Sequence, residues 1–391
     1  MAAPAPRRAT PSPEEHAHRA GRIGAVDLFR GLTLSGVILV TSIQSFPEVR
    51  AVLRHAPWRG ITIVDIGLPL MLFIVGLSAQ LSVAGRRARG ESDAAITRHA
   101  ALRALLLFVL GIAGLTFPDF HLATIRLTGI LQSIAITYFV ATLLLLHTRL
   151  RAQVAVILAI LLGYWLVLVF VRVPETGLRG SALFDRPGET IAAYIDRRLL
   201  GPHLNPNTRR WDTEGILPTI SALSTVLIGS LTARWMQRER HEAERLAGLF
   251  AAGTLLGAAG FAWGWTYPVI KGLWTGSYVL VTAGAAMLAL ATCIWLAGTA
   301  DGERWTRPFT ALGRNALLIY GGFIALGGAL TVWRITGGTG EAVPVRRVLY
   351  EVLFDSWLPT TDALVAYACA SLAIWLAVAW LLDRRGIVLK V

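Results

Sequence analysis

The sequence contains 391 residues, of which 54% are hydrophobic and 16% are charged, with a formal net charge of +13. Because about a quarter of the residues in a soluble globular domain are charged, this composition and the mean hydropathy of +0.57 exclude an ordinary soluble domain. Apolar runs of about 20 residues, enough for a helix to cross a bilayer, recur along the chain, whereas the alternating segments of about 10 residues typical of membrane barrels do not. The composition therefore predicts an all-α, polytopic integral membrane protein.

The chain divides into a tail and one membrane domain. Residues 1–22 are rich in Pro, Ala and charged residues, which is typical of a disordered tail. Residues 23–391 are predicted to form a single transmembrane domain. Its ten predicted helices span residues 25–46, 61–84, 100–117, 128–147, 153–172, 215–236, 245–264, 276–298, 308–333 and 362–382. The largest loop, 173–214, contains the amphipathic stretch ETIAAYIDRRLLG, which we expect at a surface.

The charged residues predict an orientation. The short loops on the side of the N-terminus are rich in arginine, and the positive-inside rule therefore places both termini in the cytoplasm. An even number of spans agrees with this orientation. Arginines between spans are explained by topology and by contact with the lipid bilayer, so no nucleic-acid partner is predicted.

A histidine and an acid stand out at the second predicted span. The stretch RHAPWRGITIVDIGLPLMLFIVG places His55 just before an apolar run and Asp65 inside it. A carboxylate that accepts a hydrogen bond from one ring nitrogen fixes the tautomer of a histidine and favours proton uptake at the other nitrogen. In the alternative interpretation, His55 is an interfacial loop residue and Asp65 bonds to the backbone. Pro69 predicts a bend in the helix near this site.

Ionisable residues inside a membrane are costly and usually functional. Asp27 and Arg30 are three residues apart on one face of the first helix, where they can form a structural ion pair or contact a substrate.

Three further polar clusters share the predicted outer face with His55. They consist of Arg126 and Gln132, of Asp212 and Glu214, and of Lys271, Trp274 and Tyr278. Each has a structural alternative, since acids stabilise helix N-termini and Trp, Tyr and Lys anchor spans at the interface. Their convergence on one face nevertheless indicates a site.

Taken together, these segments resemble the heparan-α-glucosaminide N-acetyltransferase family and its bacterial relatives. The matching pieces follow the family's order across nearly the whole membrane region: VDLFRGLTL, HAPWRGITIVDIGLPLMLFIVG, RLTGILQSIAITYF, WDTEGILPTISALSTVLIG, IKGLWTGSYVL and PFTALGRNALLIY. The family acetylates a terminal amino sugar on the lumenal side with acetyl-CoA from the cytoplasm. The resemblance implies that acetyl-CoA is a co-substrate, that no metal is needed, and that the chain lies in a bacterial plasma membrane.

The resemblance also implies roles for individual residues. His55 matches the active-site histidine, and Asp65 matches the acid in the following helix. The implied acceptor-binding residues are Asp212, Glu214, Trp274 and Lys271, and the donor-site candidates are Thr41, Arg30, Arg126, Gln132, Arg314 and Asn315. Two departures concern the acyl centre and the acceptor, because Thr41 and Ile270 stand where family members often have Asn.

The predicted chemistry is acyl transfer from a thioester. An amine or hydroxyl must lose a proton as it attacks, and histidine is suited to accept it. His55 is predicted to be the general base or a transient acyl acceptor, with Lys271, Trp274 or Thr41 stabilising the oxyanion. Cytoplasmic arginines are predicted to bind the phosphates of coenzyme A; the candidates are Arg86, Arg87, Arg234, Arg238 and Arg314.

Three other functions compete with this prediction. A transporter of a polar metabolite would suit ten helices, although the sequence has no internal repeat. An O-acyltransferase would use a hydroxyl on a cell-envelope glycan, and an inactive scaffold would keep only the fold. The expected partners are the bilayer and an amino sugar or glycan, and a homodimer is left open.

Overall fold

The computed structural model describes residues 13–50, 53–117, 122–238, 241–299, 301–336 and 342–388. The α-helices are α1 (Pro13–Ile43), α2 (Gly67–Ala88), α3 (Asp93–Thr116), α4 (Ile130–His147), α5 (Leu150–Phe170), α6 (Ile191–Leu200), α7 (Ile216–Met236), α8 (Glu242–Trp263), α9 (Gly276–Ala297), α10 (Gly302–Arg314), α11 (Ala316–Val332), α12 (Val345–Tyr350) and α13 (Thr360–Arg384). Strands β1 (Arg334–Thr336) and β2 (Ala342–Pro344) form an antiparallel pair that places Ile335 opposite Val343.

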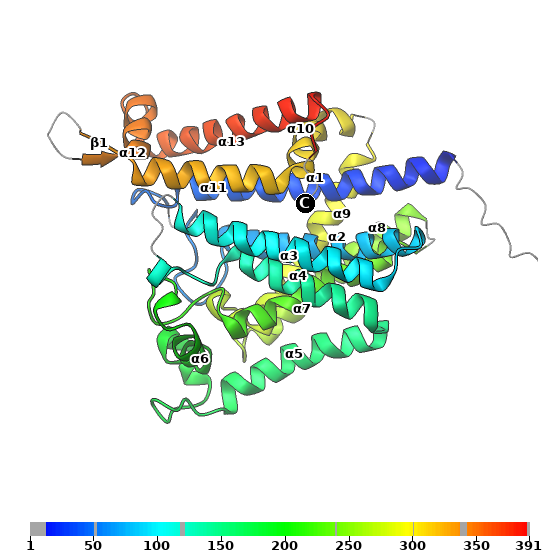
Figure 1. The fold of residues 1–391 in the computed structure, drawn as a ribbon, viewed down its shortest axis with the longest axis horizontal. Helices are drawn as coiled ribbons and strands as arrows, with labels where there is room; N and C mark the ends of the chain where they lie inside the picture. Colours follow the sequence, from blue (N-terminus) through cyan, green and yellow to red (C-terminus); the bar gives the residue numbers. More distant parts are fainter. Residues whose placement is uncertain are drawn as a thin grey trace, which may run out of the picture.

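The helices confirm the predicted fold class. Within the described residues, nine helices are long and apolar enough to cross a membrane, and the bent pair α10–α11 adds a tenth crossing if it counts as one span. In Figure 1, α1, α3, α5, α11 and α13 run broadly parallel, with α6 and α12 at one end of the bundle and the start of α1 at the other. The protein is therefore an all-α, polytopic membrane protein.

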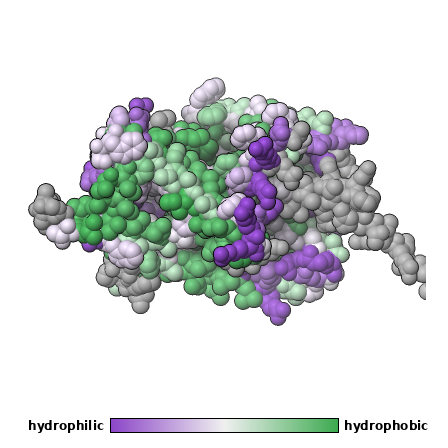
Figure 2. All heavy atoms as spheres, turned by 90° about the horizontal axis from the view of Figure 1, so that it is seen from above, coloured by the Kyte–Doolittle hydropathy of each residue, from purple (hydrophilic) through white to green (hydrophobic). Residues whose placement is uncertain are grey.

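The apolar surface fits a lipid environment. Figure 2 shows a broad apolar area with hydrophilic residues gathered toward one end. On α3 and α5, exposed leucines recur at three- and four-residue spacings that place them on one face of each helix. These residues are Leu102, Leu105 and Leu106 on α3, and Leu158, Leu162 and Leu166 on α5.

Most predicted boundaries agree with the structure to within a few residues, and the differences have local causes. Helix α3 starts at Asp93 rather than at residue 100, because Ser92 caps its first turn by accepting a hydrogen bond from the Ala95 amide (3.2 Å). Helix α1 is assigned from Pro13, inside the segment predicted to be a tail, and residues 1–12 lie outside the described residues.

The predicted helix at 308–333 is two helices. Helices α10 and α11 meet at 72°, and Asn315 lies between them with its side-chain amide donating to the carbonyl of Ile387 (3.1 Å). A hydropathy pattern cannot show this bend, because the apolar run continues through it.

Helix α7 lies at the centre of the bundle. Of its apolar window, 72% is buried, compared with 17% for α8 and for α13. Glycines bring α7 close to α2, since a Cβ atom at Gly76 would lie 1.8 Å from the Val226 carbonyl oxygen and one at Gly229 would lie 2.1 Å from that of Phe73. Such small residues allow helix backbones to pack closely in a membrane. The core therefore fixes α2, the helix that follows Asp65.

Candidate active site

His55, Asp65 and Lys271 come together at one end of α2. The His55 Nδ1 atom lies 2.7 Å from Asp65 Oδ1 and 2.8 Å from Lys271 Nζ. Lys271 Nζ also lies 3.3 Å from Asp65 Oδ1. The Asp65 side chain is fully buried, whereas that of His55 is 45% exposed. The arrangement thus places a buried acid behind an accessible imidazole, as the spacing of the two residues suggested.

The backbone fixes Asp65 in this place. Asp65 lies in a short 3₁₀ turn, Ile63–Ile66, directly before α2. Its Oδ2 atom accepts hydrogen bonds from the amides of Ala56 (3.0 Å) and Thr62 (2.9 Å). The Tyr278 hydroxyl donates to its carbonyl (2.6 Å). Asp65 therefore bonds to the backbone and also contacts His55, so both contacts considered for this acid are present.

Pro69 does not act as predicted. It is the third residue of α2. In the first turn a backbone amide has no hydrogen-bond partner within the helix, so proline is tolerated there. The chain changes from 3₁₀ to α geometry before this proline rather than bending at it.

The Nδ1 atom of His55 has two competing partners. A carboxylate only accepts hydrogen bonds, so a bond to Asp65 needs the proton on Nδ1, whereas the Lys271 ammonium only donates and needs Nδ1 unprotonated. When Nδ1 donates to Asp65, the Nε2 atom keeps its lone pair and can take a proton from a substrate. Burial lowers the pKa of Lys271, although the carboxylates of Asp65 and Glu214 oppose this effect. Lys271 therefore loses its proton more readily than an exposed lysine does.

A second ionic cluster joins Arg126 to both acids before α7. Arg126 Nη2 lies 2.5 Å from Asp212 Oδ1 and 2.6 Å from Glu214 Oε2. Arg126 Nε also donates to Asp212 Oδ2 (3.1 Å), and the Thr128 hydroxyl donates to the same oxygen. Asp212 further accepts from the Glu214 amide (3.0 Å). Both oxygens of this fully buried carboxylate are occupied, so Asp212 has a structural role whatever else it does.

Glu214 differs from Asp212 in its surroundings. Burial raises the pKa of Glu214, and the Asp212 carboxylate adds to this effect, while Arg126 and Lys271 act in the opposite sense. Glu214 therefore takes up a proton more readily than an exposed glutamate. It also lines a narrow pocket together with Leu68 of α2 and Trp274.

Trp274 has an unusual backbone and a buried ring. Its φ of 52° lies in the left-handed region, which is uncommon for a residue with a side chain. The Ser221 hydroxyl holds its carbonyl (2.6 Å), and its ring packs edge-on against Tyr278 with the centroids 5.2 Å apart. Trp274 is thus part of the packing around the site and is 1% exposed.

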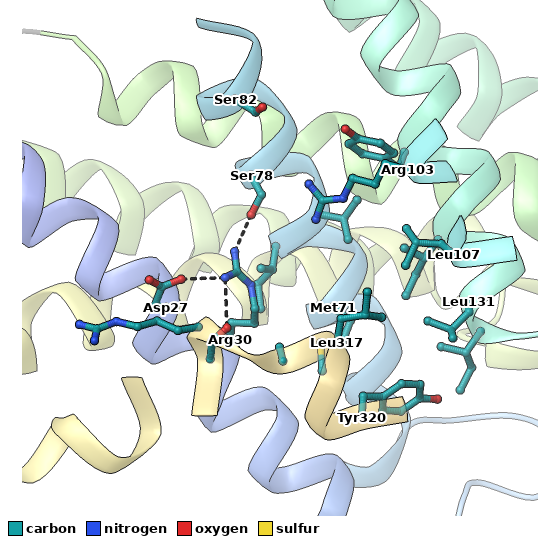
Figure 3. A pocket seen from close by; sticks show the side chains of 18 of the residues that line it. Asp27, Arg30, Met71, Ser78, Ser82, Arg103, Leu107, Leu131, Leu317 and Tyr320 are labelled. Atoms are coloured by element: carbon teal, nitrogen blue, oxygen red, sulfur yellow. Dashed lines mark hydrogen bonds and ion pairs between the residues drawn. The ribbon is translucent and has the colours of Figure 1, made fainter. Parts of the chain in front are cut away.

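A cavity of about 820 Å³ lies along α2, and none of His55, Asp65 and Lys271 is among its lining residues. Figure 3 shows a polar part around Asp27, Arg30 and Ser78 and an apolar part around Met71, Leu131 and Tyr320. Arg30 crosses the polar part, donating to Asp27 (2.7 Å), to the Ser78 hydroxyl (2.8 Å) and to the Gly313 carbonyl (3.3 Å). The cations in the lining are Arg30, Arg86, His99, Arg103 and Arg314, where His99 counts only when protonated.

The cavity follows α2 along most of its length. The residues of α2 that line it run from Leu68, one turn after Asp65, to Arg86 near the helix end. At 1.5 Å per residue, this separation is about 27 Å, close to the thickness of a bilayer core. The basic end of the cavity and the His55 cluster therefore lie at opposite ends of α2.

Several predicted residues lie outside the cavity. Thr41 is exposed on α1 and is not among the lining residues. Gln132 is buried on α4, and its amide lies against Gly111 and Gly129. Arg126, predicted for the donor site, instead holds the two acids. Asn315 lies at the bend between α10 and α11.

The predicted phosphate-binding arginines separate into two groups. Arg86 and Arg314 line the cavity, with Glu91 and Asp383 as their ion-pair partners. The others are not among the lining residues: Arg87, Arg234 and Arg238.

The sequence analysis did not identify several polar residues of the cavity wall, among them Ser78, Ser82, His99 and Arg103. His99 and Arg103 are four residues apart on α3 and so share one face, a signal that was available but looked like ordinary positive-inside bias. Among the described residues, no acid forms an ion pair with Arg103, and its guanidinium lies 5.2 Å from the centroid of the Tyr138 ring. This cation is therefore free to bind an anionic ligand.

The fold and the site define a polytopic helical membrane protein with a His–Asp–Lys cluster at one end of a helix and a basic cavity at the other. No protein-family profile matches the chain. The chain is 29% identical over 356 residues to heparan-alpha-glucosaminide N-acetyltransferase of Homo sapiens, covering 77% of this chain and 52% of that protein. The protein of the same name from Mus musculus is 28% identical over 383 residues, covering 81% and 56%. The resemblance inferred from the motifs is thereby confirmed, and the chain spans about half the length of the curated relatives it matches.

Proposed function

We propose that this chain is a transmembrane acyltransferase that moves an acetyl group from acetyl-CoA to an amino sugar or glycan on the opposite side of the membrane. The observation that carries the proposal is the cavity that follows α2 from Leu68 to Arg86. It runs from a basic end, suited to phosphates, to Leu68, three residues after Asp65, and His55 is accessible near that end of α2. The names of the two relatives agree with this chemistry.

The cavity has the chemistry that coenzyme A requires. Its phosphates would bind the basic end, where Arg86, His99 and Arg103 converge, because arginine pairs strongly with phosphate oxygens. The thioester arm would lie in the apolar part, beside Met71 and Leu131. The acetyl group would then face the turn that holds Asp65.

His55 would act on the proton of the acceptor. The acceptor nitrogen or oxygen attacks the thioester carbonyl, the Nε2 atom takes its proton, and the carbon–sulfur bond breaks to release coenzyme A, whose thiolate takes a proton back. Asp65 would hold the imidazole through Nδ1 and stabilise its charge. Lys271 is the cation nearest to this imidazole and would stabilise the oxyanion. In a second route, His55 attacks first and carries the acetyl group.

A hydroxyl acceptor is the second candidate, and one observation favours it. The acids that would attract a protonated amine already bind Arg126, and Asp65 faces His55 and Lys271. Among the described residues, the carboxylates at this end that would meet an ammonium group are thus already partnered. An amino sugar would therefore bind mainly as the neutral amine or through its ring.

The proposed orientation places both termini in the cytoplasm and His55 outside, in a bacterial plasma membrane. The arginine-rich segments support it, since the last turn of α2 and the residue after it contain Arg86, Arg87 and Arg89. Acetyl-CoA would then enter from the cytoplasm at the Arg86 end.

The test uses purified protein in liposomes with labelled acetyl-CoA and a panel of amino sugars and neutral glycan fragments. Transfer of label to an acceptor, with release of coenzyme A, is the expected result. Movement of an acceptor into the liposomes without consumption of acetyl-CoA would support a transporter instead.

A further inference from the structure

We propose that Trp58 and Trp211 form an aromatic corner that binds the sugar ring of the acceptor. This inference rests on the proposed function and names the part of the site that recognises the acceptor. The two ring centroids are 5.0 Å apart and the ring planes meet at 75°. Both side chains are only partly buried. Part of each indole side chain therefore remains accessible to a ligand.

The corner lies directly beside the reactive cluster. Trp58 follows His55 by three residues, and Trp211 precedes Asp212. Both rings pack over Gly272, the residue after Lys271: a Cβ atom there would lie 2.4 Å from Trp58 Cζ3 and 3.0 Å from Trp211 Cζ3. A ring bound at the corner would thus lie beside the Lys271 and His55 pair.

The surrounding loop holds both tryptophans in place. The Trp58 indole N–H donates to the Phe184 carbonyl, and the neighbouring Arg59 pairs with Asp185. On the other side, Arg197 of α6 donates to the Arg210 carbonyl (2.9 Å), next to Trp211. A preformed surface of this kind costs little conformational entropy when a ligand binds.

The chemistry of the corner fits a sugar ring better than a charged group. The face of an indole ring carries partial negative charge, so it attracts the C–H groups on the apolar face of a pyranose. Arg126 already pairs with Asp212 and Glu214, so the acceptor would bind to the indole rings rather than to these acids. The corner thus accounts for acceptor recognition with either an amine or a hydroxyl as the nucleophile.

The test compares acceptors with and without a ring. The variants are Trp211→Ala, Trp58→Phe and Gly272→Ala, the last of which would push the rings aside without removing them. Trp265→Ala is the control, since Trp265 lies between α8 and Lys271 and is 90% exposed. KM would be measured for glucosamine and for ethanolamine, an acyclic amine, together with kcat and the KM for acetyl-CoA.

We expect the glucosamine KM to rise about tenfold in Trp211→Ala and Gly272→Ala, with the KM values for ethanolamine and acetyl-CoA little changed. Equal losses for both acceptors, or no loss, would overturn the proposal. Calorimetry of glucosamine oligosaccharide binding, measured without acetyl-CoA, tests the aromatic corner independently of the proposed transferase function. If no acceptor is acetylated but Trp211→Ala still abolishes binding, the transferase proposal fails and the corner stands. If the unmodified protein binds no oligosaccharide, the corner fails.

Discussion

The ion cluster around Arg126 gives the sharpest test of what the acid pair does. In Arg126→Met, a side chain of similar length replaces the guanidinium, and Asp212 and Glu214 lose their common partner. The Asp212 side chain is fully buried and that of Glu214 is 11% exposed. Breaking a buried ion pair by removing one partner costs about 3–5 kcal/mol, because the remaining charge stays buried without compensation. We therefore expect the variant to unfold at a markedly lower temperature.

The compensating variant makes the reasoning testable. Replacing Asp212 by Asn and Glu214 by Gln in the Arg126→Met background removes the buried charges, so most of the lost stability should return. Arg186→Met is the control, since its ion pair with Glu189 is exposed and such pairs contribute about 0–1 kcal/mol. Thermal unfolding of the purified proteins in detergent gives the stability, and transfer assays on the same samples give the acceptor KM.

Two results would refute this reasoning. An Arg126→Met protein as stable as the unmodified one would show that the acids do not depend on the guanidinium. A compensated variant that recovers stability but loses amine acceptors selectively, with hydroxyl acceptors unaffected, would return the acid pair to the acceptor-binding role predicted from sequence.

Three other outcomes are expected. His55→Ala should lower kcat by about 10²–10⁴-fold while coenzyme A binding, measured by calorimetry, and the unfolding temperature stay unchanged; activity above a tenth of the original would contradict the assignment. Cysteines placed at Arg59 and Asn205 should react with an impermeant thiol reagent in intact cells and a cysteine at Glu91 should not, and the reverse pattern would invert the proposed orientation. Burial raises the pKa of Asp196 to about 7, so its contribution to stability is complete below about pH 4 and is lost as the pH rises through about 7; Asp196→Asn, which keeps the acceptor oxygen, should flatten the fall in unfolding temperature between pH 5 and 8, and an unchanged profile would count against this shift.

The spans were predictable because the lipid imposes a simple rule on the sequence. Every backbone group in the membrane must be hydrogen-bonded internally, so long apolar runs such as α5 and α9 form helices that composition alone locates. The bend at Asn315 was not predictable in the same way. The Asn315 side chain contacts Ile387, 72 residues away, and an apolar run does not encode that contact.

The site was predictable only where partners are close in sequence or lie on one helix face. His55 and Asp65 are ten residues apart, and the side-chain contact between them is the expected one. Arg126 and Asp212 are 86 residues apart, so the sequence contains both groups but does not indicate that they pair. The same holds for the corner of Trp58 and Trp211, where the 173–214 loop contacts the segment before the second span.

Helix α2 connects the His55 cluster to the basic end of the cavity. The turn that carries Asp65 leads directly into α2, and Arg86 lies near the other end of the same helix. The backbones of α2 and α7 pack closely at Gly76 and Gly229, where even a Cβ atom would not fit. A rigid helix holds its terminal groups at a fixed separation more accurately than a loop can. The distance between the basic end of the cavity and the imidazole is therefore set by the length of α2, and a donor held at Arg86 would present its thioester at a constant depth. In the proposed reaction, α2 would match the length of the donor to the position of the base.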